Sequence, residues 1–145
     1  MLKVGDQAPD LTLETDDGSK VAIAQLRDKP VVLFFYPKDD TPGCTIECKE
    51  FRDARAAFEN KAHVFGISAD DVASHQAFRD KFGLNFPLLA DPGGKAASAF
   101  GVWTDSQWGF MAKRTTFILE AGKITRVFDS VKPQGHAQEV LGAIA

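Results

Sequence analysis

Short apolar runs in the middle of the chain predict buried β-strands. The run Val31–Phe35 is uninterrupted and rich in β-branched and aromatic residues, which is typical of a strand covered on both faces. Val64–Ile67 has the same character, and Phe86–Ala90 is a shorter, proline-containing example. Together these runs predict the centre of a sheet.

Segments with helical spacing separate these strands. We expect a helix from about Pro42 to Asn60, and a second one that Ser68–Asp71 caps and Gly83 ends. A short helix should include Ala96–Phe100, followed by a loop, and a last helix should cover about Gly135–Ile144. Helices that follow buried strands in this way predict an α/β protein.

Two further parts of the chain are predicted to form hairpins. Near the N-terminus, Leu11–Leu13 alternates in polarity and the turn sequence Asp16–Ser19 leads into Val21–Ile23. Later, Thr115–Leu119 and Lys123–Phe128 flank a glycine-containing loop. The expected architecture is therefore α/β, with a mixed central sheet flanked by helices and an N-terminal β-hairpin. Because we find no repeat or linker, we expect one domain over residues 1–145.

Composition narrows the class of protein. Hydrophobic residues make up 44% and charged residues 26% of the 145 residues, with a net charge of −3. This balance is that of a soluble domain and provides no basic field for nucleic acid or an anionic membrane. No apolar run approaches the ~20 residues needed to span a bilayer, and the first residues lack a signal-peptide pattern. With two cysteines only, a cytoplasmic, reducing compartment is expected.

The most informative residue is Cys44, which follows the first buried strand closely. Thr41 is a good N-cap and Pro42 a good first helical residue, so Gly43 and Cys44 become the second and third helical positions. A helix start carries partial positive charge and free amide N–H groups, and both favour the reactive thiolate. Strand-to-helix junctions also bind ligands in α/β folds. The sequence therefore predicts a cysteine-based redox enzyme.

Residues near Cys44 fit a small oxygen-containing substrate. Arg114 opens the strand Thr115–Leu119 and could face the same end of the sheet as the sulfur. From periodicity alone, a surface charge at a strand end is the favoured interpretation. Thr41 offers a hydroxyl, Pro42 shields the sulfur without a competing donor, and Gly43 allows close approach to the backbone. Attack on a peroxide would give a cysteine sulfenic acid, with the departing oxygen stabilised by the arginine and the amides.

The residues around Cys44 resemble the peroxiredoxin family. Pro37-x-x-x-Thr41-x-x-Cys44 is similar to its signature, and Phe-Tyr-Pro-Lys-x-x-Thr-Pro-Gly-Cys-Thr is similar to its bacterioferritin-comigratory-protein, or Q-type, branch. The likeness continues through Arg114-x-Thr-Phe117 and beyond, over nearly the whole chain.

This resemblance implies a thioredoxin-like fold and reduction of hydrogen peroxide and organic hydroperoxides. It implies that Cys44 is the peroxidatic cysteine, that Thr41 and Arg114 assist it, and that Pro37, Pro42 and Gly43 line the substrate site. It further implies a monomer that needs no cofactor or metal and is recycled by thioredoxin or a similar thiol donor.

Cys48 departs from the branch pattern. In many members the resolving cysteine lies five residues after the peroxidatic one, where this chain has Lys49. Residues four apart on a helix have Cβ atoms about 5–6 Å apart, whereas a disulfide needs about 3.5–4.5 Å. We expect a Cys44–Cys48 disulfide that forms after the first turn or two unwind. The alternative is that Cys48 is a core residue and an external thiol resolves Cys44.

Other readings of the chain are weaker. A thioredoxin-like disulfide reductase would normally carry Cys-x-x-Cys, which is absent here; a peroxide sensor or holdase is a third alternative. The three histidines are expected to be solvated or helix-capping and make a poor zinc site, and the residues 38–40 are expected to form a solvated loop tip. Four residues are expected to pack in the core or a loop, or to form an apolar collar for bulky hydroperoxides: Trp103, Trp108, Phe110 and Met111.

Overall fold

The computed structural model describes residues 1–107 and 109–144, and within them one seven-stranded mixed sheet carries the fold. Its strand order is β2-β1-β5-β4-β3-β8-β9. β3 pairs in parallel with β4 and antiparallel with β8, while β1 and β2 form the expected N-terminal hairpin. The strands are β1 (Thr12–Thr15), β2 (Lys20–Ala22), β3 (Val31–Phe35), β4 (His63–Ser68), β5 (Leu88–Ala90), β8 (Thr115–Glu120) and β9 (Lys123–Phe128).

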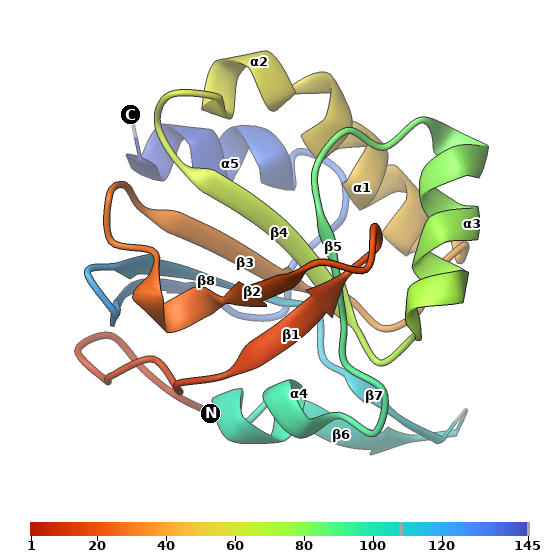
Figure 1. The fold of residues 1–145 in the computed structure, drawn as a ribbon, viewed down its shortest axis with the longest axis horizontal. Helices are drawn as coiled ribbons and strands as arrows, with labels where there is room; N and C mark the ends of the chain where they lie inside the picture. Colours follow the sequence, from red (N-terminus) through yellow and green to blue (C-terminus); the bar gives the residue numbers. More distant parts are fainter. Residues whose placement is uncertain (108, 145) are drawn as a thin grey trace.

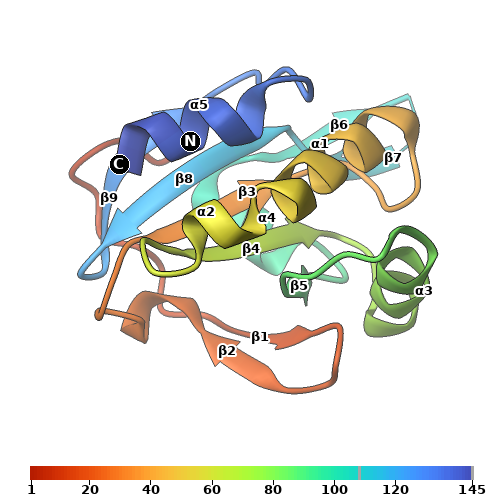
Figure 2. The ribbon, with the colours of Figure 1, turned by 90° about the horizontal axis from the view of Figure 1, so that it is seen from above.

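Helices cover both faces of this sheet. In Figure 1, α1, α2 and α5 lie above the sheet and α4 lies below it, while α3 stands at one side beside β5 and α1. Figure 2 shows α1 and α2 end to end across β3 and β4. The helices are α1 (Pro42–Asp53), α2 (Arg55–Phe58), α3 (Val72–Phe82), α4 (Lys95–Phe100) and α5 (His136–Ile144), with a 3₁₀ turn at Ile23–Gln25.

Alternate residues of β3 build the two halves of the core. Val32 and Phe34 face α1 and α5, whereas Val31, Leu33 and Phe35 face α4, because successive side chains of a strand point to opposite faces. All five residues are buried. The central strand is therefore covered on both sides, as its continuous apolar sequence predicts.

The predicted single helix over 42–60 is interrupted at Ala54. This residue has ψ near 1°, and α2 begins after it. The side-chain amide of Asn85 donates to the Arg52 carbonyl (3.2 Å), which is the acceptor that Ala56 would use in a continuous helix. A tertiary hydrogen bond thus ends α1 after three turns.

A small hairpin replaces the loop that was predicted around Trp103. β6 (Trp103–Ser106) pairs antiparallel with β7 (Gly109–Ala112). The Trp103 ring stacks on Phe110 and lies directly over Gly94, where a Cβ atom would be only 2.3 Å from the indole. This tertiary packing orders a segment that has no strong local strand signal. Among the described residues, no helix is long and apolar enough to cross a membrane.

Candidate active site

The start of α1 has the geometry that its sequence predicts, with one difference. Thr41 is extended (φ −97°, ψ 155°), Pro42 is the first helical residue, and Thr45 N–H donates to the Thr41 carbonyl (2.8 Å). The expected side-chain cap is absent, and the Thr41 hydroxyl donates to the Lys38 carbonyl (2.8 Å). This bond orients the hydroxyl and leaves its lone pairs as acceptors.

Arg114 lies against the sulfur of Cys44. Its Nη2 donates to Cys44 Sγ at 3.3 Å. Antiparallel pairing of β3 and β8 sets Phe35 opposite Thr115, so the residue before β8 lies where the chain leaves β3 towards α1. Cys44 itself is fully buried. Topology therefore brings together two residues that are 70 positions apart in the sequence.

Glu47 completes this charged group and was not singled out from the sequence. Its Oε1 accepts from Arg114 Nη1 (2.7 Å), whereas its buried Oε2 has no partner among the described residues. Burial raises the pKa of Glu47 to about 7, against the opposing effect of Arg114. The Arg114 pKa is itself raised, because the charges of Cys44 and Glu47 outweigh burial. A carboxylate on the apolar stripe of a helix, three residues after Cys44, is the signal that could have revealed it.

Gly43 makes room for the arginine. A Cβ atom at this position would lie 3.0 Å from Arg114 Nη2 and 3.4 Å from Pro133 Cγ. The segment 129–135 packs on the same site and is bonded to it, since Val131 N–H donates to the Arg114 carbonyl (3.0 Å). The glycine was expected to admit a ligand; in this structure it admits the guanidinium. Pro37 is half-buried and Pro42 is exposed at the edge of the site.

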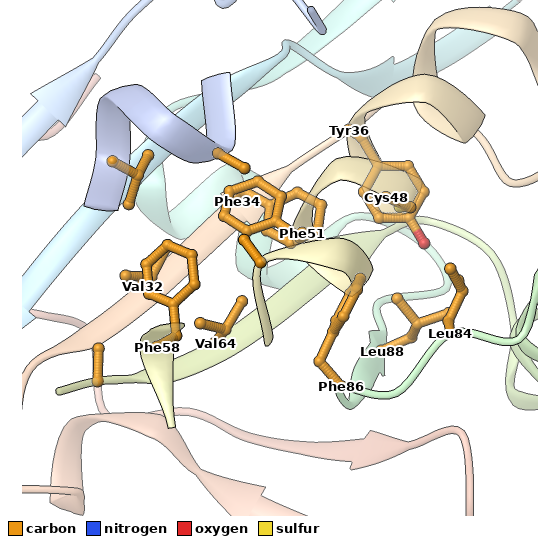
Figure 3. Close-up of a cluster of buried hydrophobic side chains, with 14 of the residues drawn as sticks. Val32, Phe34, Tyr36, Cys48, Phe51, Phe58, Val64, Leu84, Phe86 and Leu88 are labelled. Atoms are coloured by element: carbon orange, nitrogen blue, oxygen red, sulfur yellow. The ribbon is translucent and has the colours of Figure 1, made fainter. Parts of the chain in front are cut away.

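Cys48 has very different surroundings. It is fully buried in the core with Phe34 of β3, Tyr36 just after β3, and Phe51 of α1 (Figure 3). Burial raises the pKa of the Cys48 thiol well above its ordinary value, and the neighbouring negative groups at Glu47 and Cys44 add to this. Both cysteines are free. In this state Cys48 is a core thiol one turn away from Cys44.

Several predictions about neighbouring polar residues are wrong. His75 and His136 are buried rather than solvated or helix-capping, and Asp39 is buried rather than part of a solvated loop tip. Each is buried because it has polar partners: His136 contacts Thr116 and Glu139, and Asp39 contacts His75.

The large apolar residues in and near β6 and β7 differ in their exposure to solvent. Trp103 and Met111 are half-buried, Phe110 is 61% exposed, and Trp108 lies outside the described residues. Trp103 thus packs as expected, and Phe110 is an exposed aromatic side chain.

Comparison with known proteins decides the family. A model of the AhpC/TSA family matches residues 4–127. The chain belongs to this family. It is 42% identical to a peroxiredoxin bcp of Coxiella burnetii over 99% of both chains. It is also 39% identical to peroxiredoxin Bcp of Bacillus subtilis, covering 97% of this chain and 93% of the relative. These relatives place it in the Bcp and Q-type branch.

Solved structures agree with this assignment. The peroxidoxin BcpB of Mycobacterium tuberculosis superimposes with a TM-score of 0.90 at 36% identity, covering 99% of this chain and 97% of that one. A Xanthomonas campestris bacterioferritin comigratory protein, studied for alkyl peroxide reduction, gives 0.90 at 32% identity over 98% and 97%. The protein is a peroxiredoxin with a thioredoxin-like fold, and hence a thiol peroxidase that uses a peroxide and a thiol reductant.

Proposed function

We propose that Cys44 is the peroxidatic residue of this peroxiredoxin. The observation that carries the proposal is the 3.3 Å contact between Arg114 Nη2 and Cys44 Sγ at the start of α1. The thiolate attacks one peroxide oxygen, an S–O bond forms, and the O–O bond breaks to give the sulfenic acid. The leaving oxygen takes up a proton and departs as water or an alcohol. Arg114 stabilises the charge that develops on both oxygens.

Thr41 has a complementary role in this proposal. Because its hydroxyl already donates to the Lys38 carbonyl, its oxygen is free to accept the O–H hydrogen of a hydroperoxide. Pro37 and Pro42 form apolar walls that offer no N–H donors. Cys44 is fully buried, so the substrate reaches it when the segment 129–135, whose Pro133 lies beside Gly43, moves aside.

For the next step we infer a Cys44–Cys48 disulfide. Cys48 is the second of the two cysteines in the chain and lies on the same buried face of α1. Its sulfur attacks the sulfenic sulfur, the S–O bond breaks, and the hydroxyl leaves with the thiol proton as water. An intact helical turn keeps the sulfurs too far apart for a bond, so the start of α1 must unwind first. The raised pKa of Cys48 further delays attack until the thiol is released from the core.

The cellular setting is also part of the proposal. We propose thioredoxin or a similar dithiol protein as reductant, because reducing a disulfide takes two thiols. A chain with two cysteines does not resemble a disulfide-stapled secreted protein, which favours a cytoplasmic location. We also propose that residues 1–145 act as one domain and as a monomer, without nucleic acid or membrane as partner.

Single-turnover kinetics test this function. Reduced protein mixed with hydrogen peroxide should oxidise far faster than free cysteine, and Cys44→Ser should abolish the reaction. After one equivalent of peroxide, mass spectrometry should show the loss of two hydrogens in the wild type. Cys48→Ser should instead accumulate a sulfenic acid that dimedone traps. Persistent sulfenic acid in the wild type would overturn the disulfide and favour resolution by an external thiol.

A further inference from the structure

A buried ion pair joins the segment before the active-site helix to α3. His75 Nδ1 lies 2.7 Å from Asp39 Oδ2, and both side chains are almost completely buried. The same carboxylate accepts from Tyr36 Oη (2.6 Å) and Ser74 Oγ (2.8 Å). We call these four residues, Tyr36, Asp39, Ser74 and His75, the Asp39 network.

The partners of His75 fix its protonation state. Its Nε2 lies 2.8 Å from the Leu89 carbonyl, and its Nδ1 faces the Asp39 carboxylate. With Asp39 ionised, both partners accept hydrogen bonds, so both ring nitrogens donate and the ring is an imidazolium. Burial lowers the pKa of His75, but the Asp39 hydrogen bond and charge outweigh this and raise it. A doubly protonated ring has no lone pair for a metal ion, which argues against metal binding at the adjacent carboxylates of Asp39 and Asp70.

Short contacts connect this network to the first turn of α1. Asp39 follows Lys38, whose carbonyl accepts the Thr41 hydroxyl (2.8 Å). The Thr41 carbonyl in turn accepts the first helical hydrogen bond, from Thr45. Between them, Asp40 has φ of 58°, a left-handed conformation that aspartate adopts more readily than most residues with a side chain.

We propose that Asp39 and His75 are positioning residues, which hold residues 36–41 so that the start of α1 keeps Cys44 against Arg114. This inference rests on the proposed role of Cys44. The intact network should favour the peroxide step, which needs the ordered helix start. It should oppose disulfide formation, which needs that turn to unwind. Breaking the pair should therefore slow the peroxide step and speed disulfide formation. A general loss of stability gives no reason for the two rates to change in opposite directions.

His75→Leu tests the proposal, with single-turnover kinetics and amide hydrogen exchange as readouts. We expect slower oxidation of Cys44 and faster conversion of its sulfenic acid to the disulfide. Protection of the Thr45–Cys48 amides should be about tenfold weaker, because removing one partner of a buried pair is costly. His75→Asn keeps a donor towards Asp39, so its two rates and its amide protection should lie between those of His75→Leu and the wild type. If His75→Leu fails to fold, Ser74→Ala removes one hydrogen bond to Asp39 and should give the same pattern in weaker form.

Two control variants separate positioning from general stability. Lys81→Ala removes an exposed ion pair between α3 and Asp40 (2.8 Å), which joins the same two segments at the surface, and should change neither step. Asp91→Asn weakens the hydrogen bonds by which a buried carboxylate caps α4. It should lower the stability of the fold without changing the two rates in opposite directions. Slowing of both steps in His75→Leu, or unchanged protection at Thr45–Cys48, would overturn the proposal.

Titration gives an independent readout. A raised His75 pKa means that the pair contributes fully below about 6.5, the unfolded value, and is lost as pH rises through the folded value. The groups facing it are Asp39 before α1, Asp70 after β4, Tyr36 at the end of β3 and, through Tyr36 and Asp39, Cys48 on α1. Glu47 lies within Thr45–Cys48, and its raised pKa makes protection fall with rising pH in both proteins. The fall should therefore be steeper in the wild type than in His75→Leu; parallel profiles would contradict the assignment. Because exchange is measured in the reduced protein, this result stands even if Cys48 proves not to form the disulfide.

Discussion

Cys44 and Cys48 lie one helical turn apart, and both are fully buried, yet their surroundings are opposite in kind. Cys44 contacts the guanidinium of Arg114 at a helix start, whereas Cys48 lies among aromatic rings in the core. Exposure therefore does not distinguish them. The nearest charge does, because a cation stabilises a thiolate and an apolar environment destabilises it.

Removing the cation beside Cys44 should have the largest effect on the difference between the two cysteines. Arg114→Ala leaves the Cys44 sulfur without its charged donor, and we expect oxidation by peroxide to slow by about 10²–10³-fold, as for other lost transition-state donors. Stopped-flow oxidation of the reduced variant measures this. Lys113→Ala, the exposed neighbour, is the matched control and should keep the wild-type rate; an unchanged rate in Arg114→Ala would refute the role.

The Glu47 carboxyl should make stability depend on pH. Its pKa is raised from 4.5 to about 7, so between these values the folded state binds more protons than the unfolded state. Stability from this group is then present at low pH and falls by about 3 kcal/mol as pH rises from about 4.5 to about 7. Glu47→Gln should lack this fall. Urea unfolding of both proteins at the two ends of the range measures it, and superimposable pH profiles would contradict it.

A methyl group at Gly43 should weaken the arginine contact without removing the charge. The new Cβ would lie 3.0 Å from Arg114 Nη2, so Gly43→Ala should shift the guanidinium and slow oxidation by about tenfold. Gly142→Ala in α5 is the control, because a Cβ there meets nothing within 4 Å. It should leave the rate unchanged and slightly stabilise the helix. Equal rates for both alanine variants would show that Gly43 has no such role.

The smallest effect is expected at the second sulfur. Cys48→Ala leaves a small cavity in the core and should cost about 1–2 kcal/mol of unfolding free energy, measured by urea denaturation. The rate of the first oxidation should stay that of the wild type, since this sulfur has no part in that step. A slower first oxidation would mean that the two environments are coupled.

Local signals made much of the fold and the nucleophile predictable. The buried strand, the Thr-Pro-Gly helix start and the two hairpins depend on residues near one another in the sequence. The role of Arg114 depended on the peroxiredoxin resemblance, because periodicity alone favours a surface charge at the end of a strand. The peroxiredoxin resemblance, and with it the family, was also visible from the sequence.

Long-range polar contacts were not predictable in the same way. Asp39 and His75 are 36 residues apart, and each looks like a solvated residue when read with its own neighbours alone. The break at Ala54 depends on Asn85, and the β6–β7 hairpin depends on the space over Gly94. Each of these features is set by a contact that exists only once the chain is folded.

The interruption at Ala54 affects how far along the chain a structural change on oxidation can extend. The ladder of helical bonds that begins beside Cys44 stops there, and the side chain of Arg52 is fastened to the Phe82 carbonyl just before it (2.7 Å). We therefore expect rearrangement of the backbone on oxidation to stay within the three turns of α1. Proteolysis and solvent exchange beyond this boundary should be indistinguishable in the reduced and oxidised protein.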